Sequence, residues 1–411
     1  MSYSKDTFCI LPFIHFYTQA DGEVKPCCIA DGFDEKQSLR NNSIAEIFNS
    51  TEYKKLRKDM KMGVKNKVCN VCYLKEDRGE SSPRHMFNSN TLWSMPEVGE
   101  DYSVPVEFQH IDIRFSNLCN FKCRMCNHGF SSNWFGDAKK IEVNGEFPYL
   151  SDKNNKILKA SESIVEDITP HLDKVKSFYF AGGEPLITPE HYKLLIWLYE
   201  NVEDEVTHLG THKALSIHYN TNLSVIKYDE DELIKYWNSF RKVQLAISVD
   251  GIGEVGEYQR TGFKHDVFVK NLHEIQKHAD PISSTSHPDG FCYSFQYTTT
   301  ILNIEHIFDF IDFMLENDFI ETTETIDFYY AWSPQWMSIN NLSDEDKDRI
   351  TKIFNLRMSK ITSDKTKNEL NSILRYMNTD RTYSINSVKN MIEELDKVNN
   401  TDYKKILNLT F

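Results

Sequence analysis

Between residues 106 and 335, short apolar runs alternate with stretches of helical pattern, and this alternation limits the possible folds more than any other feature. The apolar runs are residues 108–115, 175–181, 215–219, 243–249, 293–298 and 325–330. Helical patterns lie between them, at residues 157–168, 189–200, 230–240, 267–279 and 304–317. Strands that are apolar along most of their length are typical of a parallel sheet covered by helices. Because a closed barrel of this type has about eight strands, the six runs predict an α/β fold with a partial (β/α)6 barrel.

The first of these strands leads directly into three closely spaced cysteines. Cys119, Cys123 and Cys126 form a C-x3-C-x2-C pattern. Three thiolates on one loop can hold three irons of a [4Fe–4S] cube and leave the fourth iron open for a substrate or a second cofactor. Taken alone, the loop could also be half of a zinc site or part of a structural cluster.

Polar residues and glycines follow the next three strands. They are Gly182, Gly183 and Glu184 after the second strand, Asn220 and Asn222 after the third, and Ser248, Asp250 and Arg260 after the fourth. Glycines let the backbone approach a ligand closely, and an arginine can hold a carboxylate through two hydrogen bonds. Active sites of open parallel sheets lie at the carboxyl ends of the strands, so these residues are candidates for ligand binding.

A second group of cysteines lies before the sheet. Cys9, Cys27, Cys69 and Cys72 supply four thiolates, and a hairpin of predicted strands at 14–18 and 23–26, with its turn at Asp21-Gly22, would bring the first two toward the C-x2-C pair. Between these cysteines, Ser43 and Glu46 fit a capping box at the start of a predicted helix at 43–49. Four thiolates can hold either zinc or a complete [4Fe–4S] cluster, and their number alone does not decide between the two. The adjacent Cys28 is either a buried small residue or the ligand in place of Cys27.

Charge and hydropathy exclude several classes of partner. The net charge of −14 does not favour nucleic-acid binding. We find no apolar run of membrane-spanning length and no signal-peptide pattern at the N-terminus, so no membrane partner is expected. Nine cysteines in tight groups without a secretory context favour metal ligation over disulfides, and the cytoplasm is the expected location.

In residues 106–335 the order of these motifs resembles the radical SAM superfamily. The resemblance implies that Cys119, Cys123 and Cys126 hold a [4Fe–4S] cluster whose open iron chelates S-adenosylmethionine. It further implies that Gly182, Gly183 and Glu184 contact the methionine amino group. The polar groups Asn220, Asn222, Ser248, Asp250 and Arg260 would hold the ribose and the carboxylate.

The N-terminal segment resembles a SPASM domain, or its shorter "twitch" version. The resemblance rests on Cys9, Gly22, Cys27 and the Cys69-x2-Cys72 pair, and on positions 44–48 and 56–57 between them. Such modules hold auxiliary [4Fe–4S] clusters, which favours iron–sulfur over zinc here. In this chain the module precedes the barrel, whereas in the family it usually follows it.

The resemblance implies an enzyme that cleaves S-adenosylmethionine reductively to a 5′-deoxyadenosyl radical, which abstracts hydrogen from a substrate. A peptide or protein side chain is the expected substrate, with a nucleotide, sugar or other small molecule as the alternative. The auxiliary cluster would assist electron transfer, and a flavodoxin or ferredoxin would supply electrons. A methyl- or thio-transferring relative and a non-catalytic zinc or iron–sulfur protein are the competing hypotheses.

The expected domain organisation has four parts. They are the auxiliary cluster module at residues 1–76, a linker at 77–105, the radical SAM core at 106–335 and a helical region at 336–411. In the last part, helices are expected at 344–358, capped by Ser343, at 365–377, with Asp364 as a cap, and at 386–398. We expect this region to cover the core without taking part in its chemistry.

Overall fold

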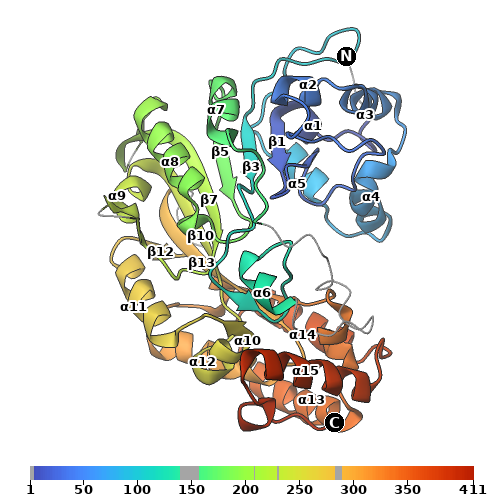
Figure 1. The fold of residues 1–411 in the computed structure, drawn as a ribbon, viewed down its shortest axis with the longest axis vertical. Coiled ribbons are helices and arrows are strands. Elements are labelled where there is room, and N and C mark those ends of the chain that lie inside the picture. The colour runs from blue at the N-terminus through green and yellow to red at the C-terminus, as the bar shows by residue number, and fades with distance from the viewer. Residues whose placement is uncertain (1–3, 139–156, 208, 229–230, 283–288) are drawn as a thin grey trace. The chain divides into compact units, whose positions relative to one another are not determined.

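The computed structural model describes residues 4–138, 157–207, 209–228, 231–282 and 289–411. The chain divides into two compact units, Met1–Ser116 with Leu158–His218, and Asn117–Ile157 with Tyr219–Phe411. Each unit is described separately below. Both are built from strands and helices in alternation (Figure 1).

The first unit contains a mostly parallel sheet. Its strands are β1 (His15–Thr18), β2 (Val24–Lys25), β3 (His110–Ile113), β5 (Ser177–Phe180), β6 (Asp204–Thr207) and the first part of β7 (Gly210–Thr221), and they follow the order β2-β1-β3-β5-β7. Strands β1, β3 and β5 run parallel, whereas β2 and β6 are antiparallel additions. The strand predicted at 14–18 therefore joins the main sheet through β3, which its sequence pattern alone does not reveal.

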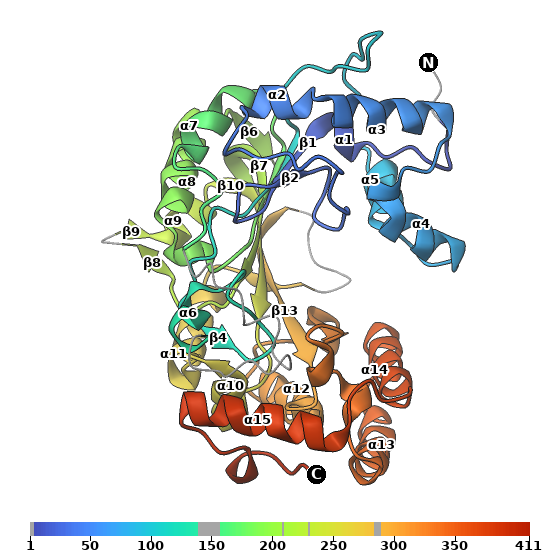
Figure 2. The same ribbon diagram turned by 45° about the vertical axis from the view of Figure 1, so that its right-hand side comes forward.

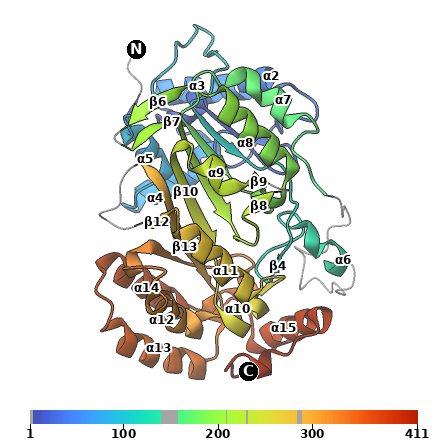
Figure 3. The same cartoon turned by 90° about the vertical axis from the view of Figure 1, so that its left-hand side faces the viewer.

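Helices of the first unit fall into two groups. Before β3 lie α1 (Leu11–Ile14), α2 (Ile44–Phe48), α3 (Thr51–Met62), α4 (Asn70–Asp77) and α5 (Pro83–Ser89); after it lie α7 (Ile164–Ile168) and α8 (Pro189–Asn201). In Figure 3, α7 and α8 lie on the side of the strands that faces the viewer, near the labels of β6 and β7. Helix α2 begins with the predicted capping box, because the Ser43 hydroxyl accepts the Glu46 N–H and the Glu46 carboxylate accepts the Ser43 N–H.

The helix predicted at 157–168 is shorter in the structure, where it begins at Ile164. The reason is a tertiary contact: the Ala160 N–H bonds to the Phe115 carbonyl, and Lys159 forms a β-bridge with Ser116. These backbone bonds hold the residues before the helix in an extended conformation. Helix propensity is a weak preference that such contacts override.

The second unit continues the alternation. Its main strands are the end of β7, β10 (Phe240–Ser248), β12 (Asp280–Pro281), β13 (Gly290–Thr299) and β14 (Ile326–Tyr330). Two short strand pairs lie apart from them: β4 (Lys122–Cys123) pairs with β11 (Arg260–Thr261), and β8 (Lys227–Tyr228) pairs with β9 (Asp231–Glu232). Strand β13 runs parallel to β10, β12 and β14. The predicted α/β fold with a mostly parallel sheet is confirmed, and the described strands form no closed barrel.

Helices of the second unit cover the sheet and form the C-terminal region. They are α6 (Phe135–Ala138), α9 (Leu233–Trp237), α10 (Gly253–Gln259), α11 (His265–Gln276), α12 (Ile307–Glu316), α13 (Asp344–Met358), α14 (Asp364–Met377) and α15 (Ile385–Asn399). The helix expected at 230–240 is α9, and its predicted start at residue 230 lies outside the described residues. Figure 2 shows α13, α14 and α15 gathered near α12.

The three predicted C-terminal helices are present, with one correction. Ser343 caps α13 as predicted, by accepting the Asp346 N–H. Asp364, however, is the first residue of α14, and the cap is Ser363, whose side chain accepts the Thr366 N–H. None of the described helices is long and apolar enough to cross a lipid bilayer.

Candidate metal centres

The three-cysteine loop belongs to the second unit and is fixed by a short strand pair. Strand β4 pairs antiparallel with β11, so that Cys123 lies opposite Arg260. The indole N–H of Trp134, a fully buried side chain, donates to the Cys123 carbonyl at 3.1 Å. The loop backbone around Cys123 is therefore held from two sides.

The three thiols of this loop are half-buried and interact with one another. The Cys126 N–H donates to the Cys123 carbonyl at 2.9 Å, and the Phe121 N–H lies 3.5 Å from the Cys119 sulfur. Burial raises the pKa of Cys126, and the neighbouring Cys123 and Cys119 thiols raise it further. Because metal ligation requires thiolates, a positively charged metal group is needed to keep these thiols ionised at neutral pH.

Asp250 and Arg260 form a buried ion pair beside this loop. The Asp250 carboxylate accepts the Arg260 Nε–H at 2.6 Å and the Thr298 N–H at 2.9 Å, and Asp250 is completely buried. Burial alone would lower the pKa of Arg260, but Asp250 and the Cys123 and Cys119 thiols raise it above its usual value. Asp250 therefore orients Arg260, and Arg260 places a permanent positive charge near the loop.

The two asparagines predicted from the third strand have different surroundings. Asn222 donates to the Asn120 side chain at 3.0 Å, and Asn120 donates to the Ser224 hydroxyl at 2.8 Å. Asn222 thus supports the cysteine loop through Asn120. The side-chain oxygen of Asn220, in contrast, is buried and has no hydrogen-bond partner among the described residues. It is an acceptor that a hydroxyl group of a ligand could satisfy.

Ser248 is half-buried at the end of β10 and lies opposite Gln296 in the pairing of β10 with β13. Directly paired residues of neighbouring strands point to the same face of a sheet. The structure therefore groups Ser248 and Gln296 on one face of the second unit.

Gly182, Gly183 and Glu184 lie in the first unit, at the end of β5. Both glycines have positive φ angles, and a Cβ atom at Gly182 would lie 2.6 Å from the Cβ and Cγ atoms of Arg114. A larger residue is therefore excluded at position 182. The buried Glu184 carboxylate accepts the Leu186 N–H at 3.0 Å and caps the short helical turn that follows. Its observed role is local, whereas the resemblance implies a ligand contact.

The four predicted module cysteines line one pocket of the first unit. Its wall consists of Cys9, Leu11, Pro12, Pro26, Cys27, Ile29, Ala30, Cys69, Val71, Cys72, Pro83 and Arg84. Burial raises the pKa of Cys69 to about 12, and the Cys27 and Cys72 thiols raise it as well. The pocket is otherwise mostly apolar, so it would shield a bound cluster from water.

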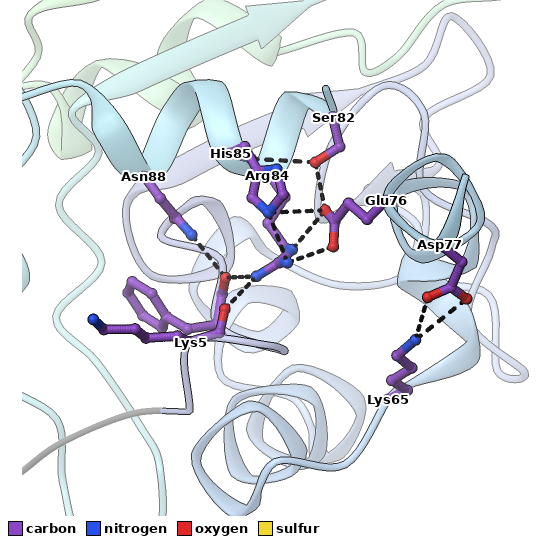
Figure 4. A network of polar contacts seen from close by, with 9 residues as sticks. Lys5, Lys65, Glu76, Asp77, Ser82, Arg84, His85 and Asn88 are labelled. Atoms are coloured by element: carbon purple, nitrogen blue, oxygen red, sulfur yellow. Dashed lines mark hydrogen bonds and ion pairs between the residues drawn. The ribbon is translucent and has the colours of Figure 1, made fainter. Parts of the chain in front are cut away.

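The wall of this pocket is closed by the buried side chain of Arg84. Its guanidinium donates to the carbonyls of Lys5 and Phe8, each at 2.9 Å, and forms a two-point ion pair with Glu76 (Figure 4). Glu76 lies on the helix that carries Cys72, and the two carbonyls precede Cys9. Arg84 thus connects the segments of two cysteines and places a positive charge beside their thiols.

No three His, Cys, Asp or Glu side chains of the described residues are arranged around a position for a single metal ion. The four irons of a [4Fe–4S] cube occupy separate corners, so its cysteine sulfurs stand farther apart than the ligands of one zinc ion. The four cysteines of the pocket match the number of thiolates that a complete cube requires.

Cys28 is not part of the pocket wall and is exposed. The expectation that it is a buried small residue is wrong. Partial desolvation raises the pKa of the Cys28 thiol, the negative charge of the buried Asp112 carboxylate raises it further, and Asp112 also forms an ion pair with Arg114 at 2.5 Å. The Arg114 guanidinium lies 4.6 Å from the centre of the Tyr17 ring. Asp112 and Arg114 were not predicted as site residues, although their alternation with Ile111 and Ile113 already indicates one polar face on β3.

The surroundings of Asp112 lead to a pH prediction. Burial raises its pKa to about 6, against the opposing effect of Arg114. Because this value exceeds the unfolded pKa of about 3.9, the contribution of Asp112 to stability is fully present below about pH 4 and is lost as the pH rises through about 6. Asp112→Asn removes this dependence. The stability of the variant relative to the wild type should therefore rise by up to about 3 kcal/mol between pH 4 and pH 7.

Urea unfolding of the metal-free protein at a series of pH values measures this difference. The matched control is Asp77→Asn, because Asp77 lies in the same unit and forms only an exposed ion pair with Lys65. A stability difference between Asp112→Asn and the wild type that stays constant over this pH range would contradict the prediction.

Comparisons with known proteins support the predicted assignment of the N-terminal module. Residues 9–73 match the family model SPASM, described as an iron–sulfur cluster-binding domain. No curated protein matches the chain.

Several solved structures are similar to parts of the chain. One is native anSMEcpe with bound AdoMet, at 19% identity and a TM-score of 0.35, over 54% of this chain and 52% of that one. A second is SuiB from Streptococcus suis bound to the precursor peptide SuiA, at 15% identity and a TM-score of 0.35, over 84% and 69%. A third is TYW1 with a lysine–pyruvate adduct, at 13% identity and a TM-score of 0.28, over 59% and 70%. The match therefore spans about half the length of the first of these proteins.

The family match covers the four pocket cysteines, and it agrees with the resemblance to radical SAM proteins that carry an auxiliary iron–sulfur module. The N-terminal module of this chain is therefore an iron–sulfur cluster-binding domain of the SPASM family, as the sequence predicts.

Proposed function

We propose that the chain is a radical SAM enzyme that oxidises a peptide or protein side chain. Cys119, Cys123 and Cys126 would hold the catalytic [4Fe–4S] cluster, and Cys9, Cys27, Cys69 and Cys72 would hold an auxiliary one. The observation that carries the proposal is the three-thiol loop, which is fixed by the β4–β11 pair and lies beside the Arg260–Asp250 ion pair.

The reduced cluster, with S-adenosylmethionine bound, supplies a 5′-deoxyadenosyl radical for hydrogen abstraction. The protein residues have separate tasks. Arg260, oriented by Asp250, is available for the carboxylate of S-adenosylmethionine, and Asn220 offers a buried acceptor to the ribose hydroxyls. Asn222 keeps the cysteine loop in place through Asn120. The backbone of Gly182 and Gly183, both at positive φ, would contact the methionine amino group, as the resemblance implies.

For the substrate, we propose a peptide or protein side chain, on the basis of the SPASM module. A small electron donor such as flavodoxin or ferredoxin would reduce the clusters, and the auxiliary cluster would accept an electron from the substrate radical left by hydrogen abstraction, which yields the oxidised product. Four cysteines leave no free position on that cluster, which favours electron transfer over substrate binding. The four-part domain organisation and the cytoplasmic location remain predictions.

Anaerobic reconstitution tests the proposal. The expected result is about eight irons and eight sulfides per chain, and formation of 5′-deoxyadenosine when dithionite and S-adenosylmethionine are added. Bound zinc without nucleoside formation would favour the non-catalytic alternative and overturn the proposal. Transfer of deuterium from a deuterated candidate peptide into 5′-deoxyadenosine would identify the substrate class. Transfer from a nucleotide or sugar instead would show that the peptide assignment is wrong.

A further inference from the structure

Arg124 lies inside the three-cysteine loop, between Cys123 and Cys126, and its side chain is completely buried. Its backbone N–H donates to the Gln259 carbonyl at 2.9 Å, and its Nε–H donates to the Tyr258 carbonyl at 2.8 Å. The guanidinium stands 3.8 Å from the centre of the Tyr258 ring. The side chain at the middle of the loop therefore points into the protein and fixes the loop to the end of α10.

The counter-charge of Arg124 comes from the C-terminal region. Asp396 on α15 accepts the Arg124 Nη2–H at 2.8 Å, and its side chain is 8% exposed. Thr401 accepts a second bond from the same Nη2 at 2.7 Å. A buried guanidinium is strongly unfavourable without a paired charge, so the position of Arg124 depends on α15.

Asp396 is itself held by the end of its helix. Its carboxylate accepts the Thr401 hydroxyl and the Tyr403 N–H, both at 2.7 Å, and the chain turns there through Asn400 in the left-handed conformation. In Figures 2 and 3, α15 lies alongside α10, which carries Tyr258. The contacts between the cysteine loop, α10 and α15 thus form one connected network within the second unit.

We infer that α15 is part of the cluster site, and that Asp396 acts as a positioning residue for the Cys123–Cys126 half of the loop. This inference rests on the proposed function, because it takes these cysteines as cluster ligands. It differs from the sequence expectation that the C-terminal helices only cover the core. The Arg124–Asp396 pair has two effects. It keeps the loop ordered before a cluster binds, and it neutralises the buried positive charge of a residue that directly follows Cys123 in the chain.

The first effect is tested on the metal-free full-length protein by hydrogen exchange and mass spectrometry. In Asp396→Asn, amide exchange of residues 117–128 should rise at least about tenfold, because one partner of a buried pair is removed. Exchange in the first unit should stay unchanged. The matched control is Glu394→Gln, on the same helix, where an exposed carboxylate pairs only with Lys397.

Thr401→Val is a second, milder variant, which removes one bond to Arg124 and one to Asp396. Thr401→Val should raise the amide exchange rate of the same residues by a smaller factor. If Asp396→Asn does not fold, Thr401→Val alone tests the inference. If residues 117–128 exchange at the wild-type rate in the variants that fold, the inference is overturned. Because these measurements need no cluster, their outcome is independent of the proposed function, which fails separately if the wild-type protein binds no catalytic cluster.

The second effect is tested on the reconstituted protein. In Asp396→Asn, the unpaired guanidinium should favour the more negative, reduced cluster and raise its midpoint potential. Asp396→Glu should restore the wild-type potential, and the double variant Arg124→Met with Asp396→Leu, which removes both charges, should also reverse the upward shift. A potential that is equal in Asp396→Asn and the wild type would show that Asp396 has no electrostatic role at the cluster.

Discussion

Cys123→Ala should reduce the iron content from about eight to about four per chain, and 5′-deoxyadenosine formation should fall below detection. Cys123 lies at the centre of the loop contacts, since its carbonyl accepts bonds from Cys126 and Trp134 and its backbone pairs with Arg260. These are backbone contacts, so the substitution removes a thiol ligand while the loop keeps its conformation. Iron and sulfide analysis with chromatography of the nucleoside products measures both effects.

The matched control for this variant is Cys292→Ala. Cys292 is buried in β13, and its sulfur lies 3.5 Å from the Val243 carbonyl, as expected for a core residue. This variant should keep both clusters and full nucleoside formation. If Cys123→Ala still forms 5′-deoxyadenosine, the assignment of the catalytic cluster to this loop is wrong.

Arg57→Met should destabilise the SPASM module by at least about 3 kcal/mol. Arg57 is completely buried and donates to the carbonyls of Pro12, Phe48 and Tyr102 at 2.9, 2.7 and 3.2 Å. Its guanidinium also stands 4.7 Å from the centre of the Phe48 ring. Methionine fills much of the same space but leaves three carbonyls without this donor, and each such group costs about 1–3 kcal/mol when buried.

Hydrogen exchange of residues 44–62 measures this loss, and a rise of about 100-fold or more is expected. The iron of the auxiliary cluster should be lost in parallel. Arg78→Met is the matched control, because Arg78 is 64% exposed and forms only a surface ion pair with Glu80. Equal exchange in the two variants would show that Arg57 does not hold the module together.

Local sequence patterns predicted the elements whose causes are local. The capping box at Ser43 and Glu46 and the start of α13 after Ser343 depend on residues three positions apart, so they can be read directly from the sequence. The strands at the six apolar runs were predicted because buried strands of this kind are apolar on both faces. The four-cysteine pocket could also be anticipated, since spacing and number restrict what closely spaced thiols can bind.

The unpredicted features depend on contacts between distant segments. The sequence pattern predicts β1 as a strand, but no local pattern predicts that β1 pairs with β3. Asp112 could have been noticed from the alternation along β3, but its raised pKa follows from burial, which is a property of the folded state. Asp396 pairs with a residue 272 positions away, so no local pattern connects α15 with the cysteine loop.

Strand β1 has a consequence for the order in which the chain can mature during synthesis. All four cysteines of the SPASM module leave the ribosome before β3 is made, yet β3 is the parallel neighbour of β1. Until then, β1 can pair only with the short β2, and a two-stranded hairpin is marginally stable in water. All residues of the pocket wall, up to Arg84, are made while β1 still lacks its parallel neighbour. We expect that a chain stopped after residue 105, which contains the whole pocket wall but lacks β3, would not retain an iron–sulfur cluster, and that cluster insertion follows the synthesis of β3.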